Sequence, residues 1–169
     1  GTPCGAPPRV DRRDMAASRR WRLAGRWGAL VTQGRLVDVP ARGTLAAASV
    51  SHAVVAEAKT AYLAGHNTWG QLGQGRTSVW GTARIALPDR IVSAAAGLGF
   101  TCLATSDALY VSGTNVRGQM GLDQERGSLS FQRLALPAVR SVCAGLDHML
   151  VLAGAQVWAC GLHTDKQLG

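Results

Sequence analysis

The sequence has no Cys-x-x-Cys pair, no Gly-Gly or Trp-Asp dipeptide, and no apolar run of membrane-spanning length. The charge-free stretch between Arg90 and Asp107 holds sixteen residues, mostly small, too few to cross about 30 Å of hydrocarbon. Four cysteines in 169 residues are too sparse for a disulfide framework, so we expect reduced thiols in an intracellular compartment.

Charged residues are also scarce, at 17%, whereas hydrophobic residues make up 47%. This balance excludes a disordered chain, and the length is enough to bury a core. The net charge of +8 is concentrated at the front: residues 1–42 hold nine Arg against three Asp, net +6, which leaves +2 for residues 43–169. The basic character therefore belongs to the N-terminal region rather than to the whole chain.

What the sequence does contain is an internal repeat. Aligning the chain with itself places residues 62–73, 110–121 and 158–169 in one register, 48 residues apart. The first landmark reads Tyr-Leu-Ala-Gly-His-Asn-Thr-Trp-Gly-Gln-Leu-Gly, and the others keep most of its glycines and its glutamine. Pro40, Pro88 and Pro137 follow nearly the same period. Three copies at a fixed spacing indicate a repeat protein.

Each copy is patterned like β-structure. A short apolar run, a turn of two or three residues and a second run that opens with an aromatic residue predict a β-hairpin. The glycines and asparagine that follow predict backbone conformations with positive φ. A last run ends near the proline, so each copy holds about four short strands, the content of one propeller blade.

The string Gly-x-Asn-x-x-Gly-Gln-Leu-Gly after an aromatic strand, with Gly-x-x-His upstream, resembles the regulator of chromosome condensation repeat. The resemblance covers about residues 44–169. It implies an all-β fold, a partial β-propeller of about three four-stranded blades from a fold that has seven. We place an Arg-rich arm at residues 1–26 and the partial propeller at residues 27–169, and we expect either a longer polypeptide or another subunit to complete it.

The repeat motif assigns structural roles to a set of conserved-register positions. The members shared between copies are Gly65, Asn67, Gly70, Gln71, Gly73, Gly113, Asn115, Gly118, Gln119, Gly121, Gly161, Gln167 and Gly169, with His52 and His148 upstream. In the third copy His163 replaces the asparagine and Lys166 replaces a glycine. A side chain in a left-handed conformation costs roughly 1–2 kcal/mol, so we expect a distorted turn there.

Nothing in the sequence indicates catalysis or a metal. There is no Gly-x-Ser-x-Gly elbow, and neither lysine follows a phosphate-binding glycine loop. Cys102, Cys143 and Cys160 share repeat positions with small or apolar residues, and no zinc-type spacing occurs. We therefore predict no enzyme activity, no metal and no cofactor.

The predicted function is binding: a non-catalytic interaction or scaffold subunit whose partners are other protein subunits of a larger assembly. The resemblance implies a second hypothesis, guanine-nucleotide exchange on a small GTPase, although no insertion interrupts the 48-residue spacing. A third is RNA or DNA binding through the arm, because guanidinium groups neutralise phosphates. The candidate contacts are Arg12, Arg13, Arg19, Arg20, Arg22 and Arg26.

The arm leaves other interpretations open. Its Arg, Ala and Ser content is also typical of an organelle-targeting segment, although Asp11 and Asp14 are not. It could equally be a solvated extension that lies on a partner. Basic character without a secretory segment favours a mitochondrion or another organelle over the nucleus or cytosol.

Overall fold

In the computed structural model, residues 22–24, 27–32, 35–40, 45–164 and 166 are described, and their side chains from residue 45 onward. The described part is all-β and contains no helix. Its fourteen strands are β1 (Arg22–Ala24), β2 (Trp27–Thr32), β3 (Arg35–Pro40), β4 (Leu45–Ala48), β5 (His52–Glu57), β6 (Thr60–Asn67), β7 (Ser78–Ala86), β8 (Ser93–Ala96), β9 (Phe100–Ala104), β10 (Ala108–Gly113), β11 (Ser128–Ala135), β12 (Val139–Ala144), β13 (His148–Ala153) and β14 (Gln156–Gly161).

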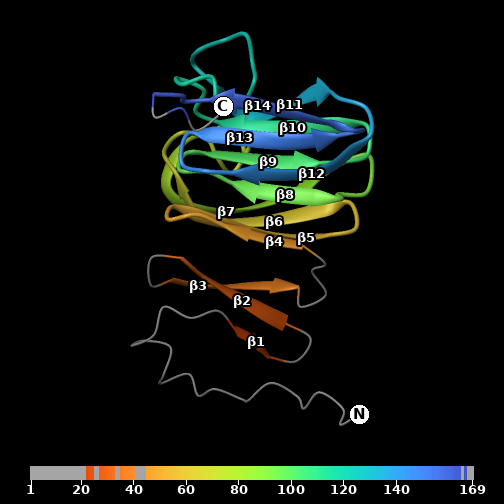
Figure 1. Cartoon of the computed structure of the whole chain (residues 1–169). Coiled ribbons are helices and arrows are strands. Elements are labelled where there is room, and N and C mark those ends of the chain that lie inside the picture. Colours follow the sequence, from red (N-terminus) through yellow and green to blue (C-terminus); the bar gives the residue numbers. More distant parts are fainter. Residues whose placement is uncertain (1–21, 25–26, 33–34, 41–44, 165, 167–169) are drawn as a thin grey trace, which may run out of the picture.

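The strands form four antiparallel sheets that follow one another along the chain (Figure 1). Sheets β4-β5-β6-β7 and β8-β9-β10-β11 have four strands each, whereas β1-β2-β3 and β12-β13-β14 have three. Within each sheet, strands adjacent in sequence are hydrogen-bonded neighbours, as hairpin connections require. The predicted fold class, an all-β array of propeller blades, is confirmed.

The repeat alignment corresponds to the strand order. The aromatic residue that opens the second apolar run lies in the third strand of each blade, as Tyr62 in β6, Tyr110 in β10 and Trp158 in β14. The pairing register is conserved as well: Tyr62 lies opposite Val55, and Trp158 lies opposite Val151. The 48-residue period is therefore the length of one blade.

The core lies between the sheets. All six residues of β10 are buried, because this strand has a sheet on each side. Leu109 and Val111 pack with Met149 and Val151 of the next blade, and Ala108 and Tyr110 pack with the preceding blade. A strand covered on both faces has apolar residues on both, which explains the continuous apolar runs.

In the described residues of the third copy, Lys166 retains one backbone feature of the motif turn. Lys166 has φ +56, in the left-handed region that Gly70 and Gly118 occupy at the same repeat position. Its amide donates to the His163 carbonyl at 3.2 Å, as Gly70 donates to Asn67. The prediction of a distorted turn is therefore wrong for this hydrogen bond. Lys166 adopts a backbone conformation that is strained for a residue with a side chain and that favours glycine.

Strand β1 lies inside the range assigned to the arm. It pairs with β2, which in turn pairs with β3, so backbone structure begins before residue 27. The boundary between arm and propeller remains a prediction, since most of the arm is outside the described residues.

Candidate interaction surface

One end of the sheets carries all the loops of the repeat motif. Because neighbouring strands run in opposite directions, the loop between the first two strands of a blade and the loop after its third strand lie at the same end. Backbone hydrogen bonds join them: His66 N to Ser51 O and Thr114 N to Gly99 O, both at 2.9 Å. We call residues 49–51, 68–77, 97–99, 114–127, 145–147 and 162–164 the loop face.

The motif asparagines hold these loops closed. The Asn115 side chain is buried; its Nδ2 donates to the carbonyls of Leu122 at 3.0 Å and Gln124 at 2.7 Å, and its Oδ1 accepts from Met120 N at 2.8 Å. Asn67 makes two matching bonds, to Arg76 O and from Leu72 N. Neither asparagine has positive φ, unlike the motif glycines. The prediction of a left-handed asparagine is therefore wrong, and the side chain caps the loop instead.

Two of the motif glutamines, Gln71 and Gln119, lie beneath the loops and are fully buried. Gln71 Oε1 accepts from Trp69 N at 3.0 Å, and Gln119 Oε1 accepts from Arg117 N at 2.8 Å. Gln119 Nε2 also reaches Asp147 Oδ1 of the next blade at 3.5 Å. The repeat equivalent of Asp147 is Gly99, which has no side-chain acceptor, and Gln71 Nε2 has no hydrogen-bond partner in the structure.

Hydrogen bonds also connect the two four-stranded blades to each other. The Thr101 hydroxyl donates to Gln71 O at 2.6 Å, and His52 Nε2 lies 2.6 Å from the same hydroxyl oxygen. Because the hydroxyl proton is committed to Gln71, the threonine oxygen accepts from Nε2–H of His52. Ser112 Oγ adds a bond to Gly70 O at 2.7 Å.

Acidification is expected to destabilise the protein through His52. Burial first, and the nearby His66 second, lower its pKa from 6.5 to about 4. Between those pH values the unfolded chain binds the proton more readily than the folded chain does. The contribution of His52 to the free energy of unfolding is therefore fully present above pH 6.5 and is lost as the pH falls through 4. The total corresponds to about 3 kcal/mol. Urea midpoints measured from pH 7.5 to 4 would show this slope.

Replacement of His52 by phenylalanine is the matched control, since Phe100 occupies this repeat position in the next blade. His52→Phe should flatten the slope relative to the unsubstituted chain. An unchanged slope would mean that another group causes the acid sensitivity.

The remaining candidate ligand residues form no metal-binding group in the part of the chain that the structure describes. Burial raises the pKa of the Cys102 and Cys160 thiols, and Cys143 is exposed on another strand. His148 is half-buried at the repeat position of His52. Within residues 45–164 and 166, no three His, Cys, Asp or Glu side chains lie close enough to hold a metal ion.

The loop face exposes large apolar side chains, which the motif did not reveal. Val50 is 74% exposed, Val116 66%, Leu146 58% and Trp69 47%. The Trp69 ring lies against Gly99 of the next blade, where a Cβ on Gly99 would come within 2.6 Å of the ring. Val50 and Leu146 share one repeat position with half-buried Leu98, whose amide donates to Leu146 O. The recurrence of an apolar residue at positions 50, 98 and 146 is the only sequence pattern that could have predicted the exposed Val50 and Leu146.

The predicted arm contacts lie mostly outside the described residues. Only the backbone of Arg22 is described, in β1. Gln167 and Gly169 of the third motif also lie outside. No helix in the described part has the length and apolarity to cross a membrane.

Together, the repeated blades and their motif loops define an RCC1-like β-propeller fold. The solved structure of human WBSCR16 is similar, with a TM-score of 0.59 and 22% identity over 70% of this chain and 35% of that one. The structure of Kap60 bound to yeast RCC1 (Prp20) gives a TM-score of 0.61 and 20% identity over 81% and 39%. No family model and no curated protein matches. The chain thus spans just over a third of the length of the two chains that it resembles.

Proposed function

We propose that the chain is a non-catalytic interaction unit of a larger protein assembly, and that its loop face binds a protein partner. The observation that carries this proposal is the exposure of Val50, Trp69, Val116 and Leu146 on one surface. Exposed apolar side chains gathered on one face mark interaction sites more often than scattered ones do. The yeast RCC1 structure is itself a complex with another protein, which supports binding as the kind of function.

Two loops of the loop face, residues 68–77 and 114–127, are held from beneath by a buried asparagine and a buried glutamine each. A partner that binds there would therefore order few groups on binding. Trp69 offers a large, partly packed ring, the type of side chain that often dominates binding energy. The neighbouring Arg117 occupies the same repeat position in the next copy, which places a cation beside the apolar group.

The double variant Val50→Asp/Val116→Asp tests this. Both side chains are exposed, so the fold should keep its stability within about 0.5 kcal/mol. The native mass of the particle that contains the full chain would be measured in the cell extract, with and without the substitutions. We expect the chain in an assembly well above 17.7 kDa and its release by the variant. An assembly that survives the double variant would refute binding through the loop face.

Two alternatives have distinct readouts. Accelerated nucleotide release from a small GTPase would favour exchange activity, and binding that weakens steeply with salt would favour nucleic-acid contact through the arm. The loop-face variant should leave salt-dependent binding unchanged, since its residues are distant in sequence from the arginines.

A further inference from the structure

The first motif loop contains a buried donor that no group in the described part of the chain satisfies. The Gln71 side chain is fully buried, and its Oε1 accepts from the amide of Trp69 at 3.0 Å. This bond fixes the orientation of the side-chain amide, because the opposite orientation would place two donors against each other. The remaining atom, Nε2, is therefore a donor, and it has no hydrogen-bond partner. A buried donor without an acceptor is unfavourable, so a ligand that supplies the acceptor is stabilised by it.

The next copy of the motif shows which kind of group completes such a site. Gln119 makes the same backbone contact, from Arg117 N at 2.8 Å. Its Nε2 lies 3.5 Å from Oδ1 of Asp147, in the loop between the first two strands of the following blade. The equivalent of Asp147 one blade earlier is Gly99. The first copy thus has the same donor without the carboxylate that serves it in the second copy.

An aromatic ring lies where that carboxylate would be. A Cβ on Gly99 would come within 2.6 Å of Trp69 Cε3 and 2.9 Å of Thr114 Cγ2. By the repeat alignment, the ring therefore occupies the place of the Asp147 side chain in the next blade. Trp69 is 47% exposed, so its ring can turn towards solvent without leaving a packed core.

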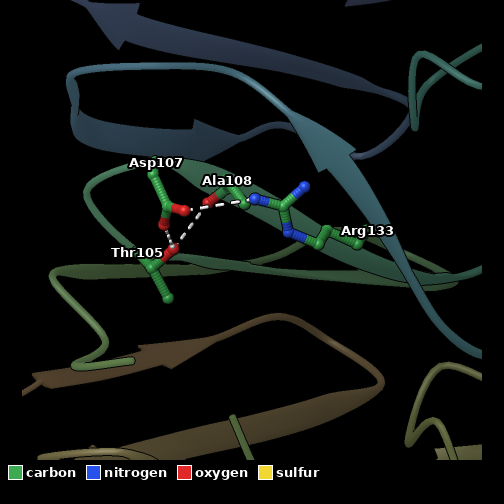
Figure 2. A network of polar contacts seen from close by, with 4 residues as sticks. All are labelled: Thr105, Asp107, Ala108 and Arg133. Atoms are coloured by element: carbon green, nitrogen blue, oxygen red, sulfur yellow. Dashed lines mark hydrogen bonds and ion pairs between the residues drawn. The ribbon is translucent and has the colours of Figure 1, made fainter. Parts of the chain in front are cut away.

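The carboxylate of the second blade itself is committed elsewhere. Asp107 lies in the turn between β9 and β10, at the end of the sheets opposite the loop face. There Thr105 Oγ1 donates to Asp107 Oδ1 at 2.8 Å, and Arg133 donates to Asp107 Oδ2 at 3.1 Å (Figure 2). The acceptor for the buried glutamine must therefore come from outside the described residues.

The loop beside Gly99 also carries an exposed cation. Thr114, which would contact a Cβ on Gly99, begins the loop of residues 114–127. Arg117, three residues further on, is exposed, and its guanidinium forms no ion pair within the described residues. An unpaired guanidinium favours an anionic ligand over a neutral one.

We propose that this part of the loop face binds a carboxylate: an Asp or Glu side chain of the protein partner enters between the Trp69 ring and Gly99 and accepts from Gln71 Nε2. The inference rests on the proposed function, because it names the chemistry that the loop face recognises. The ring turns outward and packs on the stem of the incoming side chain, and Arg117 supplies the attracting charge. The partner thereby makes, between two proteins, the contact that Asp147 makes within the chain. A hydrogen bond to an ionised acceptor is stronger than one to a neutral group.

The donor can be observed by heteronuclear NMR of the isotope-labelled full chain, with sodium acetate as the probe and sodium chloride at equal ionic strength as the reference. We expect the side-chain amide resonances of Gln71 to shift saturably with acetate, whereas those of Gln119 should not, because Asp147 already uses that donor. Asp147→Gly should make the Gln119 resonances respond as well. Trp69→Ala should raise the affinity for acetate several-fold, because the ring no longer has to be displaced.

Zero-length crosslinking identifies the source of the carboxylate in the native assembly. Thr68 is exposed beside Trp69, so Thr68→Lys places an amine at the site that a carbodiimide couples to a neighbouring carboxylate. We expect the coupled residue, identified by peptide mass spectrometry, to be an Asp or Glu of another polypeptide. Adding Gln71→Met should lower the yield about fivefold. Lys59, at the opposite end of the sheets, is the control amine and should not couple to the same residue.

The proposal fails if the Gln71 resonances do not respond to acetate, or if those of Gln119 respond equally in the unsubstituted chain. Coupling only to carboxylates of this same polypeptide would refute a partner as the source. Failure of the proposed function is distinguishable, because Val50→Asp/Val116→Asp leaves Gln71 in place. An assembly that survives that double variant, together with an intact acetate response, would refute the partner side chain and assign the site to a free carboxylate.

Discussion

Gly113→Ala is expected to destabilise the protein by about 4 kcal/mol, enough to prevent cooperative folding in a marginally stable domain. Gly113 ends β10 with φ +119. A Cβ there would lie 2.2 Å from Gly99 O and 2.6 Å from Phe100 Cα. Both obstacles are backbone atoms, one in Phe100 at the start of the paired strand β9 and one in Gly99 just before it, and they cannot move aside like the end of a side chain. Urea denaturation followed by circular dichroism and tryptophan fluorescence would measure the loss.

Gly118→Ala is the matched control, five residues along in the same motif. Gly118 also has positive φ, +71, but a Cβ there would meet nothing within 4 Å. This substitution should therefore cost only the conformational strain, about 1 kcal/mol. Equal losses at the two glycines would show that backbone conformation alone, and not the close approach of β9 and β10, makes Gly113 necessary.

The blade architecture could be predicted from the sequence because it is encoded locally and three times. A strand, a short turn and an aromatic strand are all visible within twenty residues of Tyr62 or Tyr110. The period then shows which residues are equivalent. The strands of the first sheet could not be predicted in this way, because β2 ends at Thr32 and β3 begins at Arg35. Only two residues connect these strands, too few for the glycine-rich repeat motif that follows the third strand in the later blades.

The exposed apolar side chains of the loop face could not be predicted, because a repeat pattern identifies equivalent residues but not which of them are covered. Val50 and Leu98 share one repeat position and similar chemistry, yet Val50 is 74% exposed and Leu98 is half-buried. The Leu98 amide donates to the carbonyl of Leu146 in the next blade, a contact between residues 48 positions apart that no local pattern encodes. Asn115 illustrates another limit: its residue type fits both a left-handed backbone and a capping side chain, and only the three-dimensional contacts distinguish them.

Asn115→Ala is expected to destabilise the protein by about 3 kcal/mol, since it removes three hydrogen bonds and leaves the amide of the buried Met120 without an acceptor. The two released carbonyls, of Leu122 and Gln124, can turn towards water, so the loss should come mainly from the Met120 amide. Hydrogen exchange would locate it: the amide of residue 120 should exchange much faster, while those of β9 should change only with global stability. Gln124→Ala is the control, because only the backbone of this exposed residue contacts Asn115.

Asn115→Asp tests the acceptor Oδ1 of the Asn115 side chain separately from its donor Nδ2. The aspartate retains an oxygen that can accept from Met120 N, but its carboxylate would face the Leu122 and Gln124 carbonyl oxygens, 3.0 Å and 2.7 Å from the present Nδ2. A buried carboxylate against two carbonyls is unfavourable, so Asn115→Asp should be at least as unstable as Asn115→Ala at pH 7. Because protonation turns the carboxyl into a donor, the aspartate variant should recover relative to alanine as the pH falls. If the aspartate variant instead matched the unsubstituted chain at pH 7, the acceptor alone would hold the loop, and the amide donors of the motif asparagine would have no structural role.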